Sequence, residues 1–243
     1  MKKILIISAL HGNETFSVNV LDSLTRKLAT EKHNYKWIIG NPRAAKLHTR
    51  FTQSDLNRVA PGNKDSNTYE EKRAAELIEM SKKHSLILDI HGTDAKTGIF
   101  TLITNPTIEN FLLSAVLPIS KVVIWAAKIS IKTGPVTQFT HCPAVEIECG
   151  PKSSPIVSKQ LYSSLSKFIQ NPNPGLVEIL GNLKRQKHFV VFGKGENLDT
   201  SKLSEFKQVK FNNESFYPLL INSYQEGSVR KMKPMNLFDS LSY

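Results

Sequence analysis

The chain has 243 residues, of which 40% are hydrophobic and 22% charged, so it can bury a substantial core, and its composition excludes a collagen-like or intrinsically disordered chain. Its formal net charge is +11, and its two cysteines are too few for a disulfide scaffold and indicate a reducing compartment. The basic residues are scattered and no nucleic-acid-binding motif accompanies them, so a basic solvated surface is the simpler interpretation of the charge.

The N-terminal part predicts the strands and helix of an α/β sheet. Residues 4–10 form a continuous apolar run that is typical of a buried strand. Lysines precede the run, but it is short and lacks a small-residue cleavage site, so a strand explains it better than a signal peptide. Apolar residues near helical spacing predict a helix over residues 15–31, and a further strand is expected at residues 35–39.

Residues 41–67 are polar and irregular, with prolines and a glycine that interrupt any regular pattern. A loop of this length is uncommon inside a compact domain unless it has a function, so we expect it to contribute to a site. After it, Thr68 and Glu71 have the spacing of a capping box, which predicts a helix that extends to about His84.

The middle of the chain continues this alternation of apolar runs and amphipathic segments. The stretch 111–131 is apolar, but proline and lysine residues interrupt it, so it fits a helix and a strand better than a membrane span. The alternation predicts an α/β sheet layered by helices. Strands are expected at residues 85–90, 97–103, 121–125 and 144–148, and a helix is expected at residues 154–170.

Residues 170–175 contain prolines, asparagines and a glycine in close succession, which makes them the clearest domain boundary in the sequence. We therefore expect a main domain of residues 1–170 and a small β-rich C-terminal domain or cap of residues 176–243. The β-like runs in the second part are at residues 176–180, 188–192, 206–210 and 216–221.

Three residues at predicted strand ends have the chemistry of a metal site. His11 and Glu14 follow the first strand, and His91 follows the strand 85–90, so all three are expected at the edge where an α/β sheet presents its site. Two imidazoles and a carboxylate are one of the ligand sets of catalytic zinc. The His-x-x-Glu spacing alone is more often a surface pair, so the metal hypothesis depends on the other motifs.

The polar loop contains a second group of candidate residues. Arg50 is followed by Asp-Leu-Asn-Arg at residues 55–58. Read alone, this segment is a solvated loop, and Asp89 before His91 is a turn or capping residue. Next to a metal site, carboxylates such as Asp55 and Asp89 can orient imidazole ligands through their second nitrogen, and arginine can bind a carboxylate with two parallel hydrogen bonds.

A further motif lies on the strand 144–148. Glu146 and Glu148 alternate there, a pattern that would normally have one solvated face, and the turn Gly150-Pro151 follows the strand. Glu148 is therefore at the strand end. Cys149 has no evident partner base and is interpreted as a buried small residue rather than a nucleophile.

Together and in this order, these motifs resemble those of the succinylglutamate desuccinylase and aspartoacylase family, a branch of the zinc carboxypeptidase fold. The resemblance covers roughly residues 1–160 and extends more weakly beyond them. It implies a mixed sheet layered by helices, one Zn²⁺ per chain in the domain 1–170, and hydrolysis of the amide bond of an N-acyl amino acid. The expected partner is a small anionic substrate, and neither a nucleic acid nor a membrane is expected.

The resemblance also assigns roles to individual residues. His11, Glu14 and His91 match the metal ligands, and Asp55 matches the carboxylate that supports the first histidine. The other matches are Arg50, which would polarise the scissile carbonyl; Asn57 and Arg58, which would bind the α-carboxylate; Glu148, the catalytic glutamate; and Tyr224, which would reach the substrate from the C-terminal domain.

The sequence departs from the family in one segment. Aspartoacylases carry an arginine shortly before the catalytic strand that binds the side-chain carboxylate of the substrate, whereas residues 134–140 contain no arginine. N-acetylaspartate is therefore not the expected substrate, and a neutral or differently placed polar side chain fits better. Lys128, Lys132 or Lys231 could instead supply the missing charge from another direction.

Other functions stay open beside that of an N-acyl amino acid deacylase. The same chemistry would serve a carboxypeptidase-like hydrolase of short peptides or cell-wall fragments, and the size of the pocket would decide between them. A binding protein that kept the fold and lost catalysis is a further alternative, against which the complete set of ligands argues. We expect a cytoplasmic protein, and the oligomeric state is open, a homo-oligomer included.

Overall fold

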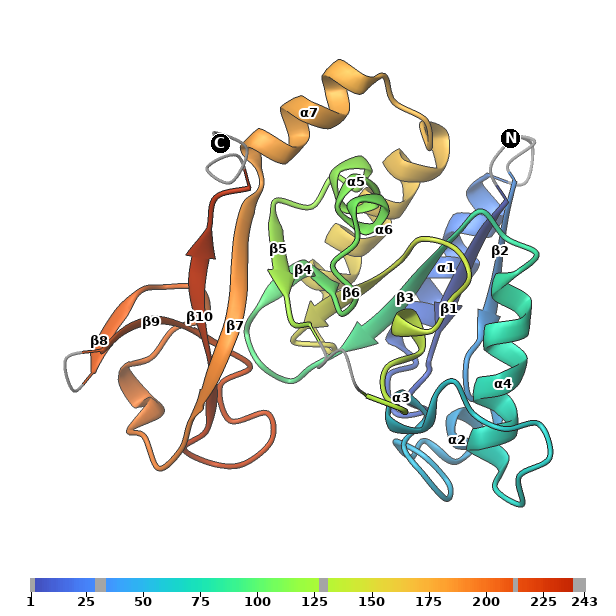
Figure 1. Ribbon diagram of the computed structural model, residues 1–243, viewed down its shortest axis with the longest axis horizontal. Helices are drawn as coiled ribbons and strands as arrows, with labels where there is room; N and C mark the ends of the chain where they lie inside the picture. The colour runs from blue at the N-terminus through green and yellow to red at the C-terminus, as the bar shows by residue number, and fades with distance from the viewer. Residues whose placement is uncertain (1–2, 29–33, 127–130, 212–213, 238–243) are drawn as a thin grey trace.

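The computed structural model describes residues 3–28, 34–126, 131–211 and 214–237. Its strands form one ten-stranded sheet in the order β2-β1-β3-β6-β4-β5-β7-β10-β9-β8. Figure 1 shows this sheet extending from β2 at one side of the molecule to β8 at the other. The strands are β1 (Ile4–Ser8), β2 (Tyr35–Ile39), β3 (Leu86–Gly92), β4 (Gly98–Ile103), β5 (Lys121–Ile124), β6 (Ala144–Gly150), β7 (Lys187–Gly195), β8 (Val209–Phe211), β9 (Glu214–Leu219) and β10 (Val229–Met235).

The sheet is mixed. In its first half, β2, β1, β3 and β6 are parallel neighbours. β4 runs antiparallel to β6, and β5 and β7 continue parallel to β4. β10, β9 and β8 then extend the sheet as antiparallel strands. Because β1, β3 and β6 are parallel, their carboxyl ends meet at one edge of the sheet, where open α/β sheets present their sites.

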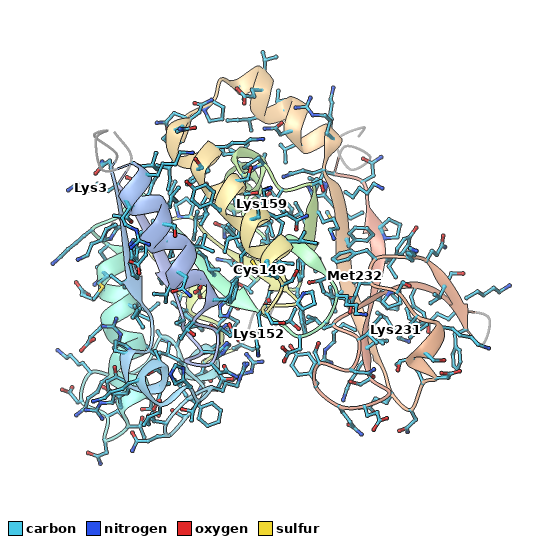
Figure 2. All side chains as sticks on the ribbon, turned by 180° about the vertical axis from the view of Figure 1, so that it is seen from behind. Lys3, Cys149, Lys152, Lys159, Lys231 and Met232 are labelled. Carbon is cyan, nitrogen blue, oxygen red and sulfur yellow. The ribbon has the colours of Figure 1, made fainter. Side chains whose placement is uncertain are left out.

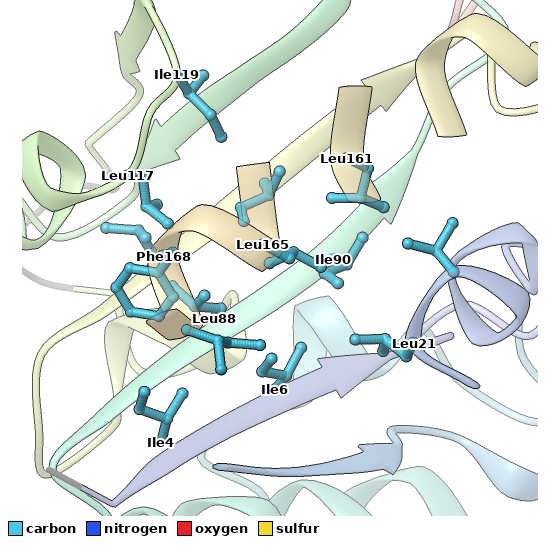
Figure 3. Packing of buried hydrophobic residues seen from close by; sticks show 14 of the residues in the cluster. Ile4, Ile6, Leu21, Leu88, Ile90, Leu117, Ile119, Leu161, Leu165 and Phe168 are labelled. Carbon is cyan, nitrogen blue, oxygen red and sulfur yellow. The ribbon is translucent and has the colours of Figure 1, made fainter. Parts of the chain in front are cut away.

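Helices cover both faces of the parallel strands. On one face, α1, α5 and α6 close the largest core cluster, and Figure 3 shows Leu165 and Phe168 of α6 packed over Leu88 and Ile90 of β3. On the other face, α3 and α4 close a second cluster. The helices are α1 (Phe16–Lys27), α2 (Pro42–Leu47), α3 (Leu56–Val59), α4 (Tyr69–Ser81), α5 (Ile108–Val116), α6 (Pro155–Gln170) and α7 (Leu176–Arg185), with 3₁₀ helices η1 (Val136–Gln138) and η2 (Thr200–Lys202).

The two-sided covering explains why β1 is apolar at nearly every position. Ile4 and Ile6 belong to the first core cluster, whereas Leu5 and Ile7 belong to the second. Successive side chains of a strand point to opposite faces, so a strand buried on both faces reads as a continuous apolar run. The predicted strand at the start of the chain is confirmed, and it ends at Ser8.

The segment 41–67 is less irregular than the sequence predicts, because it contains α2 and α3. Asn41 caps α2 by accepting the N–H of Ala44 at 3.1 Å, and Asp55 caps α3 by accepting the N–H of Asn57 at 2.9 Å. Side-chain acceptors of this kind satisfy backbone donors that a helix start leaves unpaired. Helices this short have no useful periodicity, so the sequence pattern did not reveal them.

The predicted capping box at the start of α4 is wrong in its details. α4 begins at Tyr69 as expected, but the side chain of Thr68 makes no hydrogen bond to the helix and instead contacts Ser66. The acidic residue that matters is Glu70, not Glu71, and Glu70 turns back toward the preceding loop. The helix ends at Ser81, three residues before the predicted end.

The C-terminal part differs from its prediction in several elements: α7 replaces one strand, β8 begins only at Val209, and β10 is additional. The predicted β-like run 176–180 is wrong, because these residues form the first half of α7. The apolar residues Leu176, Ile179 and Leu183 are spaced three and four apart, which is the helical period. This helix packs against α5, and Figure 1 shows it lying across the end of the molecule above α5.

The division into residues 1–170 and 176–243 stays a prediction. The sheet is continuous across this point, because β7 pairs with β5 as a parallel neighbour. β10, which the sequence pattern did not predict, lies between β7 and β9 and joins the C-terminal strands to the main sheet. The C-terminal part is therefore rich in strands, as expected, and it is also attached through the sheet itself.

The lysines are spread over the surface of the described residues. Figure 2 shows Lys3 and Lys231 at opposite sides of the molecule, with Lys152 and Lys159 between them. Several lysines are paired locally; Lys82, for example, lies 2.6 Å from Glu79. Among the helices that the structure describes, none is both long and apolar enough to cross a membrane.

Two glycine substitutions are expected to change stability in opposite directions. Gly62 has a φ of +77°, and a Cβ there would lie 2.2 Å from the Glu71 carbonyl oxygen. Gly62→Ala should therefore lower the free energy of unfolding by about 2 kcal/mol or more. Gly181 lies inside α7, and its nearest neighbour is the flexible end of Arg185 at 3.3 Å. Gly181→Ala should raise the free energy of unfolding by up to about 1 kcal/mol.

Urea unfolding followed by circular dichroism measures both values. The two variants are a matched pair, because the same methyl group is added in each. A loss of stability in Gly181→Ala equal to that in Gly62→Ala would contradict the helical conformation of residues 176–185.

Candidate active site

The candidate site lies where parallel strands end. β1 leads into the turn that carries His11, β3 carries His91 at its end, and β6 carries Glu148. The register pairs His91 with Glu148, so their side chains lie side by side on one face of the sheet. Figure 1 shows β3 and β6 ending near α3, which belongs to the connection between β2 and α4.

The turn after β1 is fixed by the chain around it. The Gly12 N–H donates to the carbonyl of Arg50 at 3.1 Å. A Cβ at Gly12 would lie 2.0 Å from the carbonyl carbon of Ala44 in α2, so only glycine allows the two segments to pack this closely. The tight packing leaves His11 4% exposed and Glu14 3% exposed.

His11, Glu14 and His91 converge on a single point. Their ligand atoms all lie within 4.8 Å of one another. His11 Nδ1 is 2.9 Å from Glu14 Oε1 and 3.3 Å from His91 Nδ1. Glu14 Oε2 is 3.4 Å from His91 Nδ1 and accepts the Gly92 N–H at 2.9 Å.

This donor set fits a metal ion. Two imidazole nitrogens that face each other at 3.3 Å beside a carboxylate are three electron-pair donors aimed at one place. Two histidines and a glutamate are a known ligand set for catalytic zinc. The three residues that the sequence singled out as ligands are therefore brought together in an arrangement that could hold such an ion.

Each histidine is also held from behind by a carboxylate. His11 Nε2 lies 3.1 Å from Asp55 Oδ1, and His91 Nε2 lies 3.0 Å from Asp89 Oδ2. Asp89 is completely buried. Carboxylates in this position fix the tautomer and the orientation of metal-binding imidazoles. Asp55 and Asp89 thus lie where their predicted roles require.

The buried cluster shifts the pKa values of its members. Burial disfavours a charged imidazole, but the carboxylates of Asp89, Glu14 and Glu146 together outweigh burial and raise the pKa of His91 well above its usual value. Burial also opposes charge on His11, and hydrogen bonds with Asp55 and Glu14 nevertheless raise its pKa. Burial would raise the pKa of Glu14, but the two histidines hold it below its usual range. The protons on these imidazoles would compete with a metal ion, since a histidine ligand must be neutral.

Arg50 reaches the cluster from the polar loop. Its Nε and Nη2 atoms lie 3.0 and 2.9 Å from Asp55 Oδ2, and its Nη1 lies 3.7 Å from Glu14 Oε1. Asp55 therefore orients both His11 and Arg50 while it caps α3. The Arg50 side chain is 42% exposed, so it can also contact a ligand in front of the cluster.

Asn57 and Arg58 are consecutive residues of α3 that differ in burial and in the number of free hydrogen-bond donors. Asn57 is buried, its Oδ1 accepts the Val136 N–H at 3.1 Å, and its Nδ2 lies 3.5 Å from His91 Nε2. Arg58 is exposed, and its Nη1 donates to the Asn57 carbonyl at 2.9 Å. Arg58 therefore has more unused donors for a substrate carboxylate than Asn57 has.

Glu146 and Glu148 both face the cavity, with Glu146 buried and Glu148 partly buried, so neither belongs to an ordinary solvated face. The reason is that β6 is central in the sheet, between β3 and β4. Enclosure by the protein raises the pKa of Glu148 to about 7, a value suited to a general base near neutral pH. Burial likewise raises the pKa of Glu146. Burial also raises the pKa of Cys149 well above its usual value, which argues against a nucleophilic thiolate.

The cluster opens into a cavity of about 540 Å³, a size typical of pockets for small molecules. Trp125 and Tyr224 form an aromatic side of this cavity, and the Arg230 guanidinium lies 5.0 and 4.7 Å from their ring centres. Tyr224 is 51% exposed, although burial of its hydroxyl and the nearby Glu148 raise its pKa. The predicted site residues that line the cavity are His11, Glu14, Arg50, Asn57, Arg58, His91, Glu148 and Tyr224.

The structure also tests where the missing positive charge could come from. Lys128 lies outside the described residues. Lys231 pairs with Glu214 at 2.6 Å, and Lys132 is exposed and is not among the described residues of the cavity. A lysine that the sequence interpretation missed, Lys152, does line the cavity, with its Nζ 3.2 Å from Asp94 Oδ2. Lys152 directly follows the Gly150-Pro151 turn at the end of the strand that carries Glu148, and this position could have indicated that it lies near the site.

A second missed residue, Glu70, supports the loop that carries the site. Its carboxylate accepts the backbone N–H groups of Thr52, Gln53 and Ser54 at 2.7–3.4 Å. It also accepts the Thr52 hydroxyl at 2.6 Å and the Asn41 amide at 3.3 Å. One completely buried carboxylate thus fixes the segment between Arg50 and α3. No motif in the sequence reveals this role.

Comparison with known proteins gives a family for the chain. Residues 1–167 match the family model of the succinylglutamate desuccinylase/aspartoacylase catalytic domain. The chain is 34% identical over 124 residues to a probable aspartoacylase of Prochlorococcus marinus, across 48% of this chain and 42% of that protein. It is 27% identical over 194 residues to aspartoacylase of Mus musculus, across 70% of this chain and 61% of that protein. The chain therefore spans less than two thirds of the length of these relatives.

Solved structures match the chain along nearly its whole length. A succinylglutamate desuccinylase from Chromobacterium violaceum has a TM-score of 0.70 at 17% identity and covers 96% of this chain and 85% of its own. Murine aminoacylase 3 has a TM-score of 0.73 at 14% identity, with 96% and 95% covered. At these identities the likeness concerns the fold, and it confirms the predicted zinc carboxypeptidase-like α/β fold.

The role of Glu70 predicts a large loss of stability in Glu70→Gln. Glutamine keeps one acceptor oxygen and would turn an NH₂ group toward backbone donors, so the free energy of unfolding should fall by about 2–4 kcal/mol. Hydrogen bonds to Thr52 hold the pKa of Glu70 below its usual value although burial opposes this. This stabilisation is therefore complete at neutral pH and is lost as the pH falls below the carboxylate's ordinary pKa.

Denaturant unfolding at neutral and acidic pH measures this effect. Glu71→Gln, one position further along α4, is the matched control and should change stability by less than about 0.5 kcal/mol. Equal effects of the two substitutions, or a Glu70→Gln effect that grows as the pH falls, would contradict the assigned role.

Proposed function

Because the chain belongs to the succinylglutamate desuccinylase/aspartoacylase family, we propose that it is a zinc-dependent hydrolase that cleaves the amide bond of an N-acyl amino acid. The observation that carries this proposal is the convergence of His11, Glu14 and His91 beside Glu148 in one cavity. Metal ligands, a carboxylate with a raised pKa and arginine side chains are the groups that hydrolysis of an amide needs.

The residues present fit a zinc ion, which His11, Glu14 and His91 would hold. When bound, zinc supplies Lewis-acid activation of water and of the scissile carbonyl. Asp55 and Asp89 keep the two imidazoles oriented toward the ion through their contacts with the second ring nitrogens.

The chain's own side chains supply the proton transfers and the charge stabilisation. Glu148 takes a proton from the attacking water and later delivers it to the leaving nitrogen, a cycle suited to a carboxyl group with a pKa of about 7. Arg50 places positive charge beside Glu14 and the carbonyl that becomes negatively charged. Arg58 binds the α-carboxylate with its remaining guanidinium donors, and Tyr224 closes the cavity from the C-terminal side.

The cavity favours a small substrate over a peptide or cell-wall fragment. The loop between β9 and β10 crosses its side, where Ser223 Oγ lies 3.2 Å from Thr93 Oγ1 and Tyr224 lines the entrance. This contact joins the C-terminal part to the residues that follow His91. A cavity of about 540 Å³ bounded in this way suits an acylated amino acid.

The metal assignment predicts that His91→Ala loses zinc. The ligand set would fall from three protein donors to two, and tight binding depends on the complete set. Zinc content after dialysis, measured by atomic emission, and zinc affinity, measured by competition with a chromophoric chelator, report this directly. His141→Ala, at an exposed histidine, is the control and should keep the zinc of the parent. Unchanged tight zinc in His91→Ala would exclude the assignment.

The role of Glu148 predicts that Glu148→Gln keeps its zinc and loses turnover. Glutamine is nearly isosteric but cannot accept the proton of water, so kcat should fall by about 10²–10⁴-fold or more. The parent is first screened against N-acetyl, N-formyl and N-succinyl amino acids, and the variant is then assayed on the best substrate. Glu178→Gln, at an exposed residue of α7, should have parental turnover. A Glu148→Gln enzyme with near-parental kcat would assign the base to another residue, with Glu146 the nearest candidate.

A further inference from the structure

A buried polar patch forms part of the cavity beyond Glu148. Glu146 lies two residues earlier on the same face of β6, Thr104 follows β4, and Thr137 belongs to η1. All three residues are at most 5% exposed, and Thr104 and Glu146 line the cavity. We refer to Thr104, Thr137 and Glu146 as the cavity floor.

The hydrogen bonds of the cavity floor have a fixed direction. Thr137 Oγ1 donates to Glu146 Oε1 at 2.8 Å. A hydroxyl has one hydrogen, so Thr137 must accept in its 2.8 Å contact with Thr104 Oγ1. Thr104 therefore donates to Thr137 and keeps no hydrogen for the cavity. A ligand that reaches Thr104 finds an oxygen that can only accept.

Glu146 has unused hydrogen-bonding capacity as well. In the part of the chain that the structure describes, Thr137 is its hydrogen-bond partner, and no lysine or arginine there forms an ion pair with it. An ionised carboxylate has about four lone-pair sites, so most of them are free. The cavity floor thus combines a buried acid with an accepting hydroxyl, and none of its three residues is cationic.

The cavity floor lies next to the place where the amino-acid part of a substrate would bind. Arg58 donates to the backbone of Asn57, and the Asn57 side chain accepts the N–H of Val136 in η1. An α-carboxylate on Arg58 would therefore lie beside the segment that carries Thr137. The side chain on the adjacent carbon would extend along this segment toward Thr104 and Glu146.

We propose that the cavity floor selects N-acyl amino acids whose side chain ends in an uncharged hydrogen-bond donor, above all a carboxamide, and that it disfavours a side-chain carboxylate. The inference rests on the proposed function, because it names the substrate class of the same site. A carboxamide can donate one N–H to Thr104. Its second N–H can pair with the ionised carboxylate of Glu146, the form in which Glu146 accepts from Thr137. A carboxylate has acceptors only and would lose its hydration at Thr104 without replacement.

Isosteric ligand pairs test the proposal in the zinc-loaded full-length chain. N-acetyl-glutamine is compared with N-acetyl-glutamate, and N-acetyl-asparagine with N-acetyl-aspartate, by kcat/KM. The free amino acids are compared by calorimetric Kd, which needs no turnover. We expect the amide to exceed the carboxylate by tenfold or more in at least one pair, in kcat/KM and in affinity.

A matched pair of threonine variants shows whether the cavity floor causes the preference. Thr104→Val removes the accepting oxygen at constant shape and should reduce the amide-to-carboxylate ratio by about tenfold. Thr101→Val is the control, because Thr101 lies on the same part of the chain, is completely buried with an unpartnered hydroxyl, and points to the opposite face of β4. Its ratio should equal that of the parent.

The outcomes separate this proposal from the proposed function. Selection by the cavity floor is overturned if the amide and carboxylate ligands are used equally, or if the carboxylate is preferred. It is also overturned if Thr104→Val leaves the amide-to-carboxylate ratio unchanged. Deacylation itself stands in each of these cases. Preferential binding of the amides without turnover of any N-acyl amino acid supports the cavity floor and contradicts the deacylase. Neither binding nor turnover of any member of the series overturns both.

Discussion

His11 and His91 are buried with their Nδ1 atoms 3.3 Å apart. The contacts of the surrounding chain hold the two imidazoles at this distance. Two imidazoles so close repel each other when both are charged, and burial makes that charge still less favourable. Carboxylates offset the unfavourable charge of the two imidazoles. Glu14 lies beside the Nδ1 atoms, and Asp55 and Asp89 lie beside the Nε2 atoms. A divalent cation would relieve the same strain more completely, because it accepts all three electron pairs at once.

The parallel strands alone do not create this arrangement, and the loop 41–67 supplies what they lack. β1 and β3 bring His11 and His91 to one edge, but Asp55 comes from the connection between β2 and α4, where it caps the short helix α3. Glu70 makes that possible, since its buried carboxylate collects the backbone donors at residues 52–54. The site therefore depends on a structural residue in α4 that never contacts the ligands.

The sequence predicted the strands and the site better than the loop and the C-terminal part, for physical reasons. β1 and β3 were predictable because burial on both faces makes most of their positions apolar. His11, His91 and Glu148 lie at the ends of β1, β3 and β6. α2 and α3 are too short to show a period, and their capping residues were indistinguishable from a polar loop. The run at 176–180 was assigned to a strand from its composition, whereas the spacing of Leu176, Ile179 and Leu183 is helical. Glu70 could not be predicted, because its partners are backbone groups far away in sequence.

The two acids of β6 line the same cavity but have different neighbours. The strand period of two places Glu146 and Glu148 on the same face, about 7 Å apart along the strand. Glu148 is paired with His91 near the carboxyl ends of β6 and β3, whereas Glu146 is paired with Asp89 two residues earlier on each strand. The hydrogen bonds of Glu146 come from η1, in the segment 134–140 that lacks the arginine expected of an aspartoacylase. The segment that departs from the family thus contacts β6 at Glu146, while Glu148 is held beside His91 by the pairing of β6 with β3.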